Sequence, residues 1–221
     1  ILRGLVGSEM CIRDRLHAGH RRVIEAVCQQ PADGIPTVVS FWPHPREVLH
    51  GEPRLRLDLP DEKLHLLEPL GIEQLVLVPF DRQLAQFSAA EFVDQILIGT
   101  LQARHIAIGA NFRFGRGREG GADTLRSLAE AAGVKVSVLP ILEDPVGRMS
   151  SSRIREALSK GDLATASDLL QRPYCFQGEV VQGRGLGRQL GWPTANLQVD
   201  GRKFLPSTLS LIHISEPTRP L

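Results

Sequence analysis

The sequence predicts an α/β domain built on a doubly wound parallel sheet, followed by the first part of a β-barrel domain. Short apolar runs alternate with helical segments between residues 16 and 171, and the sequence becomes β-like and glycine-rich after residue 172. Near-continuous apolar strands are typical of parallel sheets that are covered on both faces. Their regular alternation with helices favours a sheet with helices on both sides.

Four apolar runs are expected to be the strands of this sheet. Each is rich in Val, Ile and Leu and is bounded by Gly, Pro or charged residues. They comprise residues 37–41, 74–79, 105–109 and 135–139. Sheets of this kind bind ligands at the carboxyl ends of their strands, so the loops that follow these runs are the expected place for a site.

Helices are expected between the strands, and several have recognisable ends. Leucines at helical spacing stop at Gly71, and Ser88 begins a helix in which Glu91 completes a capping box. Another helix ends at Gly133, a typical C-cap. The expected helices are 21–29, 61–70, one starting at residue 88, 123–132, 153–160 and 163–171.

A domain boundary is expected at Arg172-Pro173, where the helical pattern stops. Strands are expected beyond it at 174–182 and 197–199. Both chain ends lack the surrounding periodicity and resemble translated sequencing-adapter read-through, so we expect them to be non-native. The expected units are residues 1–15 (tail), 16–171 (first domain, without its first strand), 172–206 (start of the second domain) and 207–221 (tail).

Composition argues for small-molecule ligands. The 221 residues carry a formal net charge of +1, which provides no electrostatic reason to expect nucleic acid or a membrane surface as partner. The apolar runs are too short to span a bilayer. Cys11, Cys28 and Cys175 form no CxxC pair, so a reducing cytoplasm is the expected location. The sequence does not indicate an oligomeric state.

The first motif is His17-Ala18-Gly19-His20, at the start of an expected helix. A spacing of three places both imidazoles on one side of the first turn. Gly19 lets the backbone approach a ligand, and the free N–H groups of a helix start favour phosphate. Two imidazoles there would stabilise the charge that develops during phosphoryl attack. The alternative is a pair of surface histidines.

The second motif is Ser150-Ser151-Ser152-Arg153-Ile154-Arg155. Its hydroxyls are good N-cap groups. Two arginines in the first turn oppose the helix dipole, and a bound polyphosphate would remove that conflict because guanidinium groups match phosphate oxygens. A well-capped surface helix with solvated arginines is the alternative.

Two aromatic loops follow expected strands. Residues 109–117 include Asn111-Phe112-Arg113-Phe114-Gly115, and Phe41-Trp42-Pro43-His44-Pro45 ends the first strand. Aromatic rings beside glycine and an amide suit a planar heterocycle, although core phenylalanines in a flexible loop are the simpler interpretation. His44 alone is more often structural than catalytic.

The last motif is a glycine-rich stretch, 183–191, that leads into Pro193-Thr194-Ala195-Asn196. Glycines can form a nest of N–H groups for phosphate, and Thr194 and Asn196 offer oxygen ligands to Mg²⁺ or its waters. No GK[ST] sequence is present, so this is not a Walker A loop. A turn-rich connector is the alternative.

In this order, the motifs resemble those of the prokaryotic bifunctional riboflavin kinase/FMN adenylyltransferases, also called FAD synthases. The resemblance covers residues 16–206 and implies a nucleotidyltransferase domain followed by a riboflavin kinase barrel. It implies transfer of AMP from ATP to FMN, giving FAD and pyrophosphate, with Mg²⁺ required. In full-length relatives the kinase module phosphorylates riboflavin to FMN, and here it is expected to be incomplete.

The resemblance also implies roles for individual residues. Catalytic contacts with the ATP phosphates would come from His17, His20 and Arg155. Gly19, Ser151, Ser152 and Arg153 would bind ATP, while Phe41, Asn111 and Phe114 would place the flavin. Thr194 and Asn196 would hold nucleotide and metal in the kinase module.

The chain departs from the family pattern before the first motif, where Arg15 replaces a turn glycine and no clear strand precedes it. Ser152 stands where the superfamily has threonine and keeps the hydroxyl. Two alternatives remain open at this point. One is an adenylyltransferase with a different acceptor, and the other is an inactive fragment that binds nucleotide or flavin.

Overall fold

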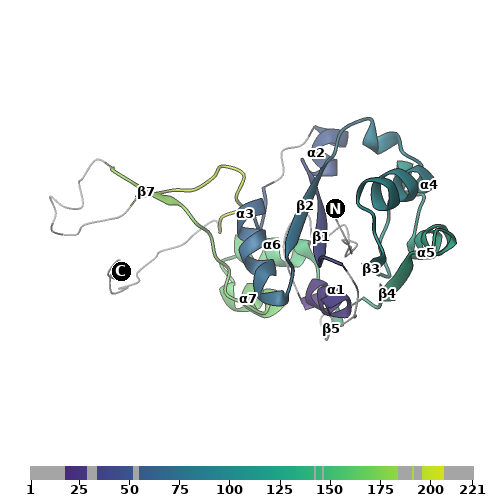
Figure 1. Ribbon diagram of the computed structural model, residues 1–221. Helices are drawn as coiled ribbons and strands as arrows, with labels where there is room; N and C mark the ends of the chain where they lie inside the picture. The colour runs from purple at the N-terminus through teal and green to yellow at the C-terminus, as the bar shows by residue number, and fades with distance from the viewer. Residues whose placement is uncertain are drawn as a thin grey trace.

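The computed structural model describes residues 18–28, 34–51, 55–141, 143–145, 147–183, 191 and 196–206. These residues form an α/β body from which the segment around β7 extends as an arm (Figure 1). Strands β1 and β2 lie in the middle of the body in this view. Helices α4 and α5 lie beside β3 and β4 on one side, and α3, α6 and α7 lie on the other (Figure 1).

The four strands predicted for the parallel sheet all form, and they pair in parallel as expected. β1 (Thr37–Trp42) pairs with β2 (Gln74–Pro79), and β3 (His105–Gly109) pairs with β4 (Lys135–Leu139). The expectation of one continuous doubly wound sheet is not met among the described residues, which form separate two-stranded sheets. Among the described residues, no backbone hydrogen bonds pair β1 with β3, and helix α1 packs against β3.

The predicted helices also form, with boundaries shifted by a few residues. The capping box at Ser88 is present, with the Ser88 hydroxyl and the Glu91 carboxylate each accepting a backbone N–H. A short helix after Trp42 was not predicted. The helices are α1 (Ala18–Cys28), α2 (Pro45–His50), α3 (Pro60–Leu67), α4 (Ala89–Glu91), α5 (Ala122–Ala131), α6 (Ser151–Ser159) and α7 (Leu163–Leu170), and a π-helical segment, Phe92–Thr100, continues α4.

Three apolar clusters hold these elements together. The largest joins β3 to the π-helical segment and α5 through residues such as Ile106, Phe92 and Leu125. A second packs α1 against the strands through Ile24 and Val38. The third lies between α6 and α7 and includes Leu57 from the loop before α3. That third cluster matters for the site because it places residues 55–58 beside α6.

The β-rich region beyond residue 172 is shorter than predicted. β7 (Glu179–Val181) and β8 (Asn196–Gln198) pair antiparallel, and the described residues there do not close a barrel. The predicted strand 174–182 forms only at its end, because Tyr174 packs against the α6–α7 cluster instead. Two further short strands, β5 (Glu143–Asp144) and β6 (Gly147–Arg148), form a hairpin before α6.

No helix within the described ranges is both long enough and apolar enough to cross a membrane.

Gly115 is required by the close approach of its loop to α4. Its φ is +74°, and a Cβ there would lie 2.8 Å from the Ala89 nitrogen. Gly133 has the matching φ of +76° with nothing within 4 Å. We expect Gly133→Ala to cost about 1–2 kcal/mol for its positive φ. Gly115→Ala should cost about 1–3 kcal/mol more, because overpacking against α4 adds to a backbone, with φ 74° and ψ 173°, that is almost restricted to glycine. Equal losses in denaturant unfolding would contradict the close contact.

His105 makes stability depend on pH. Its ring lies 2.8 Å from the Ser137 hydroxyl, and burial, helped by nearby Lys135, lowers its pKa from the usual 6.5. The folded state therefore binds this proton less readily than the unfolded chain. The stability that depends on neutral His105 is fully present above pH 6.5 and declines as pH falls towards the lower folded pKa.

We expect His105→Gln to reduce the loss of unfolding free energy between neutral and mildly acidic pH. Exposed His65 provides the matched control, since His65→Gln should leave the wild-type pH dependence in place. Denaturant unfolding over a pH series measures both, and an unchanged slope in His105→Gln would exclude this role.

Candidate functional site

A pocket of about 670 Å³ lies where four parts of the body meet. One wall is the end of β1 with α2, a second is the segment 80–87 after β2, a third is the loop after β3, and the fourth is the start of α6. The first three follow strand ends, which is where sheets of this class bind ligands. Four predicted site residues line the pocket together: Phe41, Phe114, Ser151 and Ser152.

The pocket has an aromatic wall. Phe41 contacts Phe92 with ring centroids 6.0 Å apart, and Phe92 contacts Phe114 at 5.7 Å. Phe112 stacks on Phe114 at 5.3 Å with nearly parallel rings. Phe112 and Phe114 are buried in the largest apolar cluster, so the wall is rigid. Such a surface suits a flat heterocycle, because aromatic rings add stacking to apolar burial.

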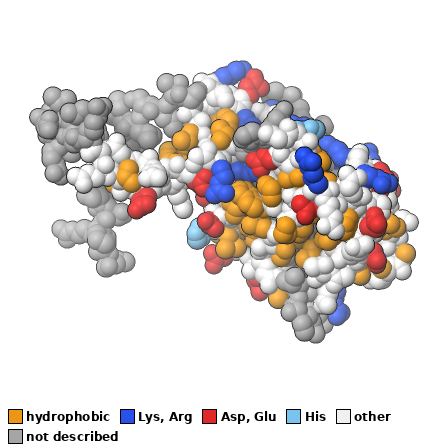
Figure 2. Space-filling view, turned by 90° about the horizontal axis from the view of Figure 1, so that it is seen from above, with side chains coloured by type: hydrophobic (Ala, Val, Ile, Leu, Met, Phe, Trp, Pro, Cys, Tyr) orange, Lys and Arg blue, Asp and Glu red, His pale blue; other side chains and the backbone are white. Residues whose placement is uncertain are grey.

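The rim of the pocket is cationic, in contrast to its apolar aromatic wall. The lining residues include four arginines, Arg46, Arg113, Arg116 and Arg118, whose side chains are exposed. His44 and His50 also line the pocket, and no Asp or Glu is found among the described lining residues. On the face in Figure 2, acidic and basic side chains are interspersed among apolar ones. The cationic character is therefore local and favours an anionic ligand.

The start of α6 adds backbone donors to this rim. Ser150 is the N-cap, and its hydroxyl accepts the Arg153 N–H at 3.4 Å. Ser151 and Ser152 follow in the first turn and line the pocket. The first turn contains no acidic residue. Helix starts of this kind attract anions because unpaired N–H groups and the helix dipole act together.

The start of α2 is held by a second cap. The His44 ring accepts the Arg46 N–H at 3.0 Å, while the Glu47 carboxylate accepts the His44 N–H at 3.0 Å. Glu47 also pairs with the buried Arg56 at 2.6 Å. The structural interpretation of His44 is thus supported, because the ring holds the turn that carries Arg46 into the pocket.

Two other predicted residues are next in the chain to lining residues but do not line the pocket themselves. Asn111 follows β3 beside Phe112 and is partly buried, and its side-chain oxygen has no hydrogen-bond partner among the described residues. That orphaned acceptor would be satisfied by a donor on a ligand. Arg153 sits in the first turn of α6, directly after the lining serines.

The remaining predicted residues are not gathered at this pocket. His20 is fully buried on α1, and Gly19 lies in the same helix. Arg155 is on α6 but donates to the Leu55 carbonyl oxygen at 2.7 Å, and its guanidinium lies 5.0 Å from the Phe204 ring. Their contacts with ATP stay predictions.

Two predicted residues, His17 and Thr194, lie outside the described residues, as do the tails 1–15 and 207–221. Asn196 begins β8 and is exposed, with its amide against Gly183. The domain limits 16–171 and 172–206 stay predictions.

Sequence reasoning missed the arginine rim. Arg113 and Arg116 were visible in the aromatic loop motif, but nothing in the local pattern showed that they line the same pocket as the start of α6. Arg46 lies 67 or more residues from them in the chain, and only the fold brings the three together. The available signal was the arginine- and glycine-rich stretch 113–118, Arg-Phe-Gly-Arg-Gly-Arg.

Comparison with protein families covers both parts of the chain. The FAD synthetase family model matches residues 12–153, and the riboflavin kinase family model matches residues 170–213. The first match spans more than half of the 221 residues.

Curated relatives share the same description. Bifunctional riboflavin kinase/FMN adenylyltransferases from Pseudomonas fluorescens and Escherichia coli K12 are 35% and 34% identical, over 91% and 83% of this chain. The relative from Bacillus subtilis is 33% identical over 88% of the chain. The chain spans 65%, 60% and 62% of these relatives' lengths.

Among solved structures, a crystal structure described as a macrolide-efflux protein from Streptococcus pneumoniae is similar. Its TM-score is 0.77 at 28% identity, over 93% of this chain and 67% of the other.

Proposed function

This chain belongs to the FAD synthetase family, and we propose on that premise that it transfers AMP from ATP to FMN, giving FAD and pyrophosphate. The observation that supports this proposal best is the pocket itself. It sets an aromatic wall, suited to a flavin ring, beside an arginine rim and the start of α6, which suit phosphates. FMN combines these two chemical features in one molecule.

The reaction is a direct displacement at phosphorus. A phosphate oxygen of FMN attacks the α-phosphorus of ATP and forms a new P–O bond. The bond from the α-phosphorus to the oxygen that bridges to the β-phosphorus breaks, and pyrophosphate leaves with that electron pair. Little covalent chemistry is needed from the protein, so the contribution of the pocket is positioning and charge stabilisation.

Residue roles follow from this proposal. Phe41 and Phe114 would contact the flavin ring, and Asn111 would accept a donor on it. Ser151 and Ser152, with the backbone N–H groups of α6, would bind the triphosphate together with Arg153. The roles of His17, Gly19, His20 and Arg155 at the ATP phosphates remain part of the proposal on the strength of the family resemblance.

Magnesium belongs to the proposal as the counter-ion of the ATP phosphates, since Mg²⁺ is commonly held through substrate phosphates. Among the described residues, no three His, Cys, Asp or Glu side chains come together as a metal site. For the region matched by the riboflavin kinase model, we propose that Thr194 and Asn196 serve nucleotide and metal in phosphorylation of riboflavin by the complete module.

The test is turnover by the purified chain. We expect ATP and FMN with Mg²⁺ to yield FAD and pyrophosphate in equal amounts, measured by chromatography and a coupled pyrophosphate assay. If pyrophosphate release depends on pantetheine phosphate or nicotinamide mononucleotide, and not on FMN, then that compound is the acceptor and the FMN proposal is wrong. Binding of FMN without any product would identify the chain as a binding fragment.

Arg116 provides a test of the cationic rim. Arg116→Gln should weaken FMN binding by about 1.4- to fivefold at low salt, because exposed ion pairs contribute about 0.2–1 kcal/mol. The effect should shrink as salt is added. Calorimetric titration measures it, and Arg126→Gln on α5, outside the pocket lining, is the control. Equal affinities for the two variants would remove Arg116 from the site.

A further inference from the structure

The end of the described chain returns to the α/β body. Residues 200–206 lie against residues 55–58, and we call 200–206 the clasp. The Arg56 N–H donates to the Arg202 carbonyl oxygen at 2.6 Å, and the Phe204 N–H donates to the Arg56 carbonyl oxygen at 2.6 Å. The clasp lies in the region matched by the riboflavin kinase model, whereas 55–58 lie in the region matched by the FAD synthetase model.

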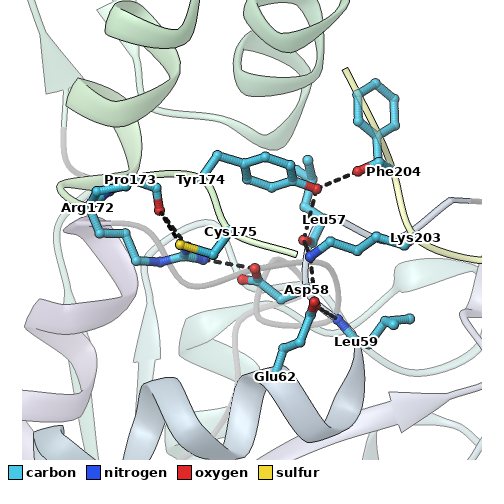
Figure 3. Close-up of polar contacts among 10 residues, drawn as sticks. All are labelled: Leu57, Asp58, Leu59, Glu62, Arg172, Pro173, Tyr174, Cys175, Lys203 and Phe204. Carbon is cyan, nitrogen blue, oxygen red and sulfur yellow. Dashed lines mark hydrogen bonds and ion pairs between the residues drawn. The ribbon is translucent and has the colours of Figure 1, made fainter. Parts of the chain in front are cut away.

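Lys203 anchors the clasp with a buried charge. Its ammonium donates to the Leu57 carbonyl oxygen and to the Glu62 carboxylate, both at 2.6 Å (Figure 3). Its side chain is fully buried, and it lies 4.9 Å from the Tyr174 ring centroid. Burying an ammonium costs free energy unless it is paired and hydrogen-bonded. The clasp is therefore stable in a position where Lys203 reaches both Leu57 and Glu62.

The segment after α7 completes this arrangement. The Arg172 guanidinium pairs with the buried Asp58 carboxylate at 2.8 Å. The Tyr174 hydroxyl lies 2.6 Å from the Phe204 carbonyl oxygen and 3.2 Å from that of Leu57 (Figure 3). Burial, and secondarily the nearby carboxylates Asp58 and Glu62, raises the pKa of this hydroxyl, which therefore remains a donor.

The clasp reaches the α2 wall of the pocket. The guanidinium groups of Arg56 and Arg202 lie 5.2 and 5.1 Å from the Trp42 ring centroid. Trp42 directly follows Phe41 of the aromatic wall. Arg56 also pairs with Glu47, which caps α2. Arg202, together with Arg56, therefore supports the end of β1 that carries Phe41 and the start of α2.

The clasp also reaches the α6 wall. The Phe204 ring lies 5.0 Å from the Arg155 guanidinium. Arg155 donates to the Leu55 carbonyl oxygen at 2.7 Å, in the same loop that the clasp pairs with. Arg155 is one helical turn from Ser151 and Ser152, which line the pocket. Two walls of the pocket, those formed by α2 and by α6, thus contact one segment of the chain that belongs to the other family region.

We propose that the clasp positions the α2 and α6 walls of the FMN–ATP pocket, with Lys203 as the positioning residue that seats it. The part that concerns FMN rests on the function proposed above. Docking of the clasp then sets the affinity of the pocket for FMN. FMN bound in the pocket stabilises the docked clasp in return, as linkage requires.

The experiment uses the full chain and three variants. Lys203→Met removes the buried charge, and Arg202→Gln removes the Trp42 contact and the Asp200 ion pair while leaving the buried charge in place. Lys160→Met is the matched control, because Lys160 also pairs with a glutamate but on an exposed surface. FMN affinity is measured by titration, and amide hydrogen exchange is followed in residues 44–50 and 200–206, at a temperature where circular dichroism shows each variant folded.

We expect Lys203→Met to weaken FMN binding about fivefold or more, in the range of typical coupling between sites. Exchange in 44–50 should accelerate, and FMN should slow exchange in 200–206 of the wild type. Arg202→Gln should shift both readouts in the same direction by a smaller factor, while Lys160→Met should match the wild type. If Lys203→Met fails to fold, the Arg202→Gln result decides.

The proposal is overturned if folded Lys203→Met, or Arg202→Gln in its place, binds FMN as the wild type does and leaves exchange in 44–50 unchanged. The proposed function fails separately, through absence of FAD and pyrophosphate from the wild type. In that event the exchange rates of 44–50 in the variants still decide whether the clasp supports the α2 wall.

Discussion

The ion pair between the buried Arg56 and Glu47 is the interaction on which much of the site depends. The Arg56 side chain is 2% exposed, and a buried guanidinium needs a carboxylate beside it. Glu47 provides that carboxylate from the first turn of α2, so the ion pair fixes where α2 begins. The same carboxylate accepts the His44 N–H and so sets the turn after β1. Because the Arg56 backbone pairs with the clasp, one buried residue links β1, α2 and the returning chain.

The aromatic and the cationic parts of the pocket are built on different kinds of structure. Its aromatic wall is part of the main core, so its shape is held by the packing that stabilises the whole body. Its charges lie on exposed loops and at a helix start, where solvation makes them inexpensive to maintain. This division explains how a chain of net charge +1 can present an anion site without a basic surface as a whole.

Much of the fold was predictable because it depends on local patterns. The apolar runs of β2, β3 and β4 were placed to the residue, and the Ser88–Glu91 capping box formed as expected. The predictions failed where distant contacts intervened. Strand 174–182 is shortened because Tyr174 is drawn into the α6–α7 cluster, and α2 escaped notice because its cap is a histidine held by a carboxylate.

The sequence by itself determined the strand segments, the helix ends and the ordered motifs that carry the family resemblance, since each of these depends on residues close together in the chain. Only the tertiary structure decided which side chains share the pocket. Phe41, Phe114 and the α6 serines meet there, whereas Arg155, four residues further along α6 than Ser151, faces Leu55 and Phe204. The burial of Lys203 could not be predicted from the local sequence either, because its partners Leu57 and Glu62 lie more than 140 residues away in the chain.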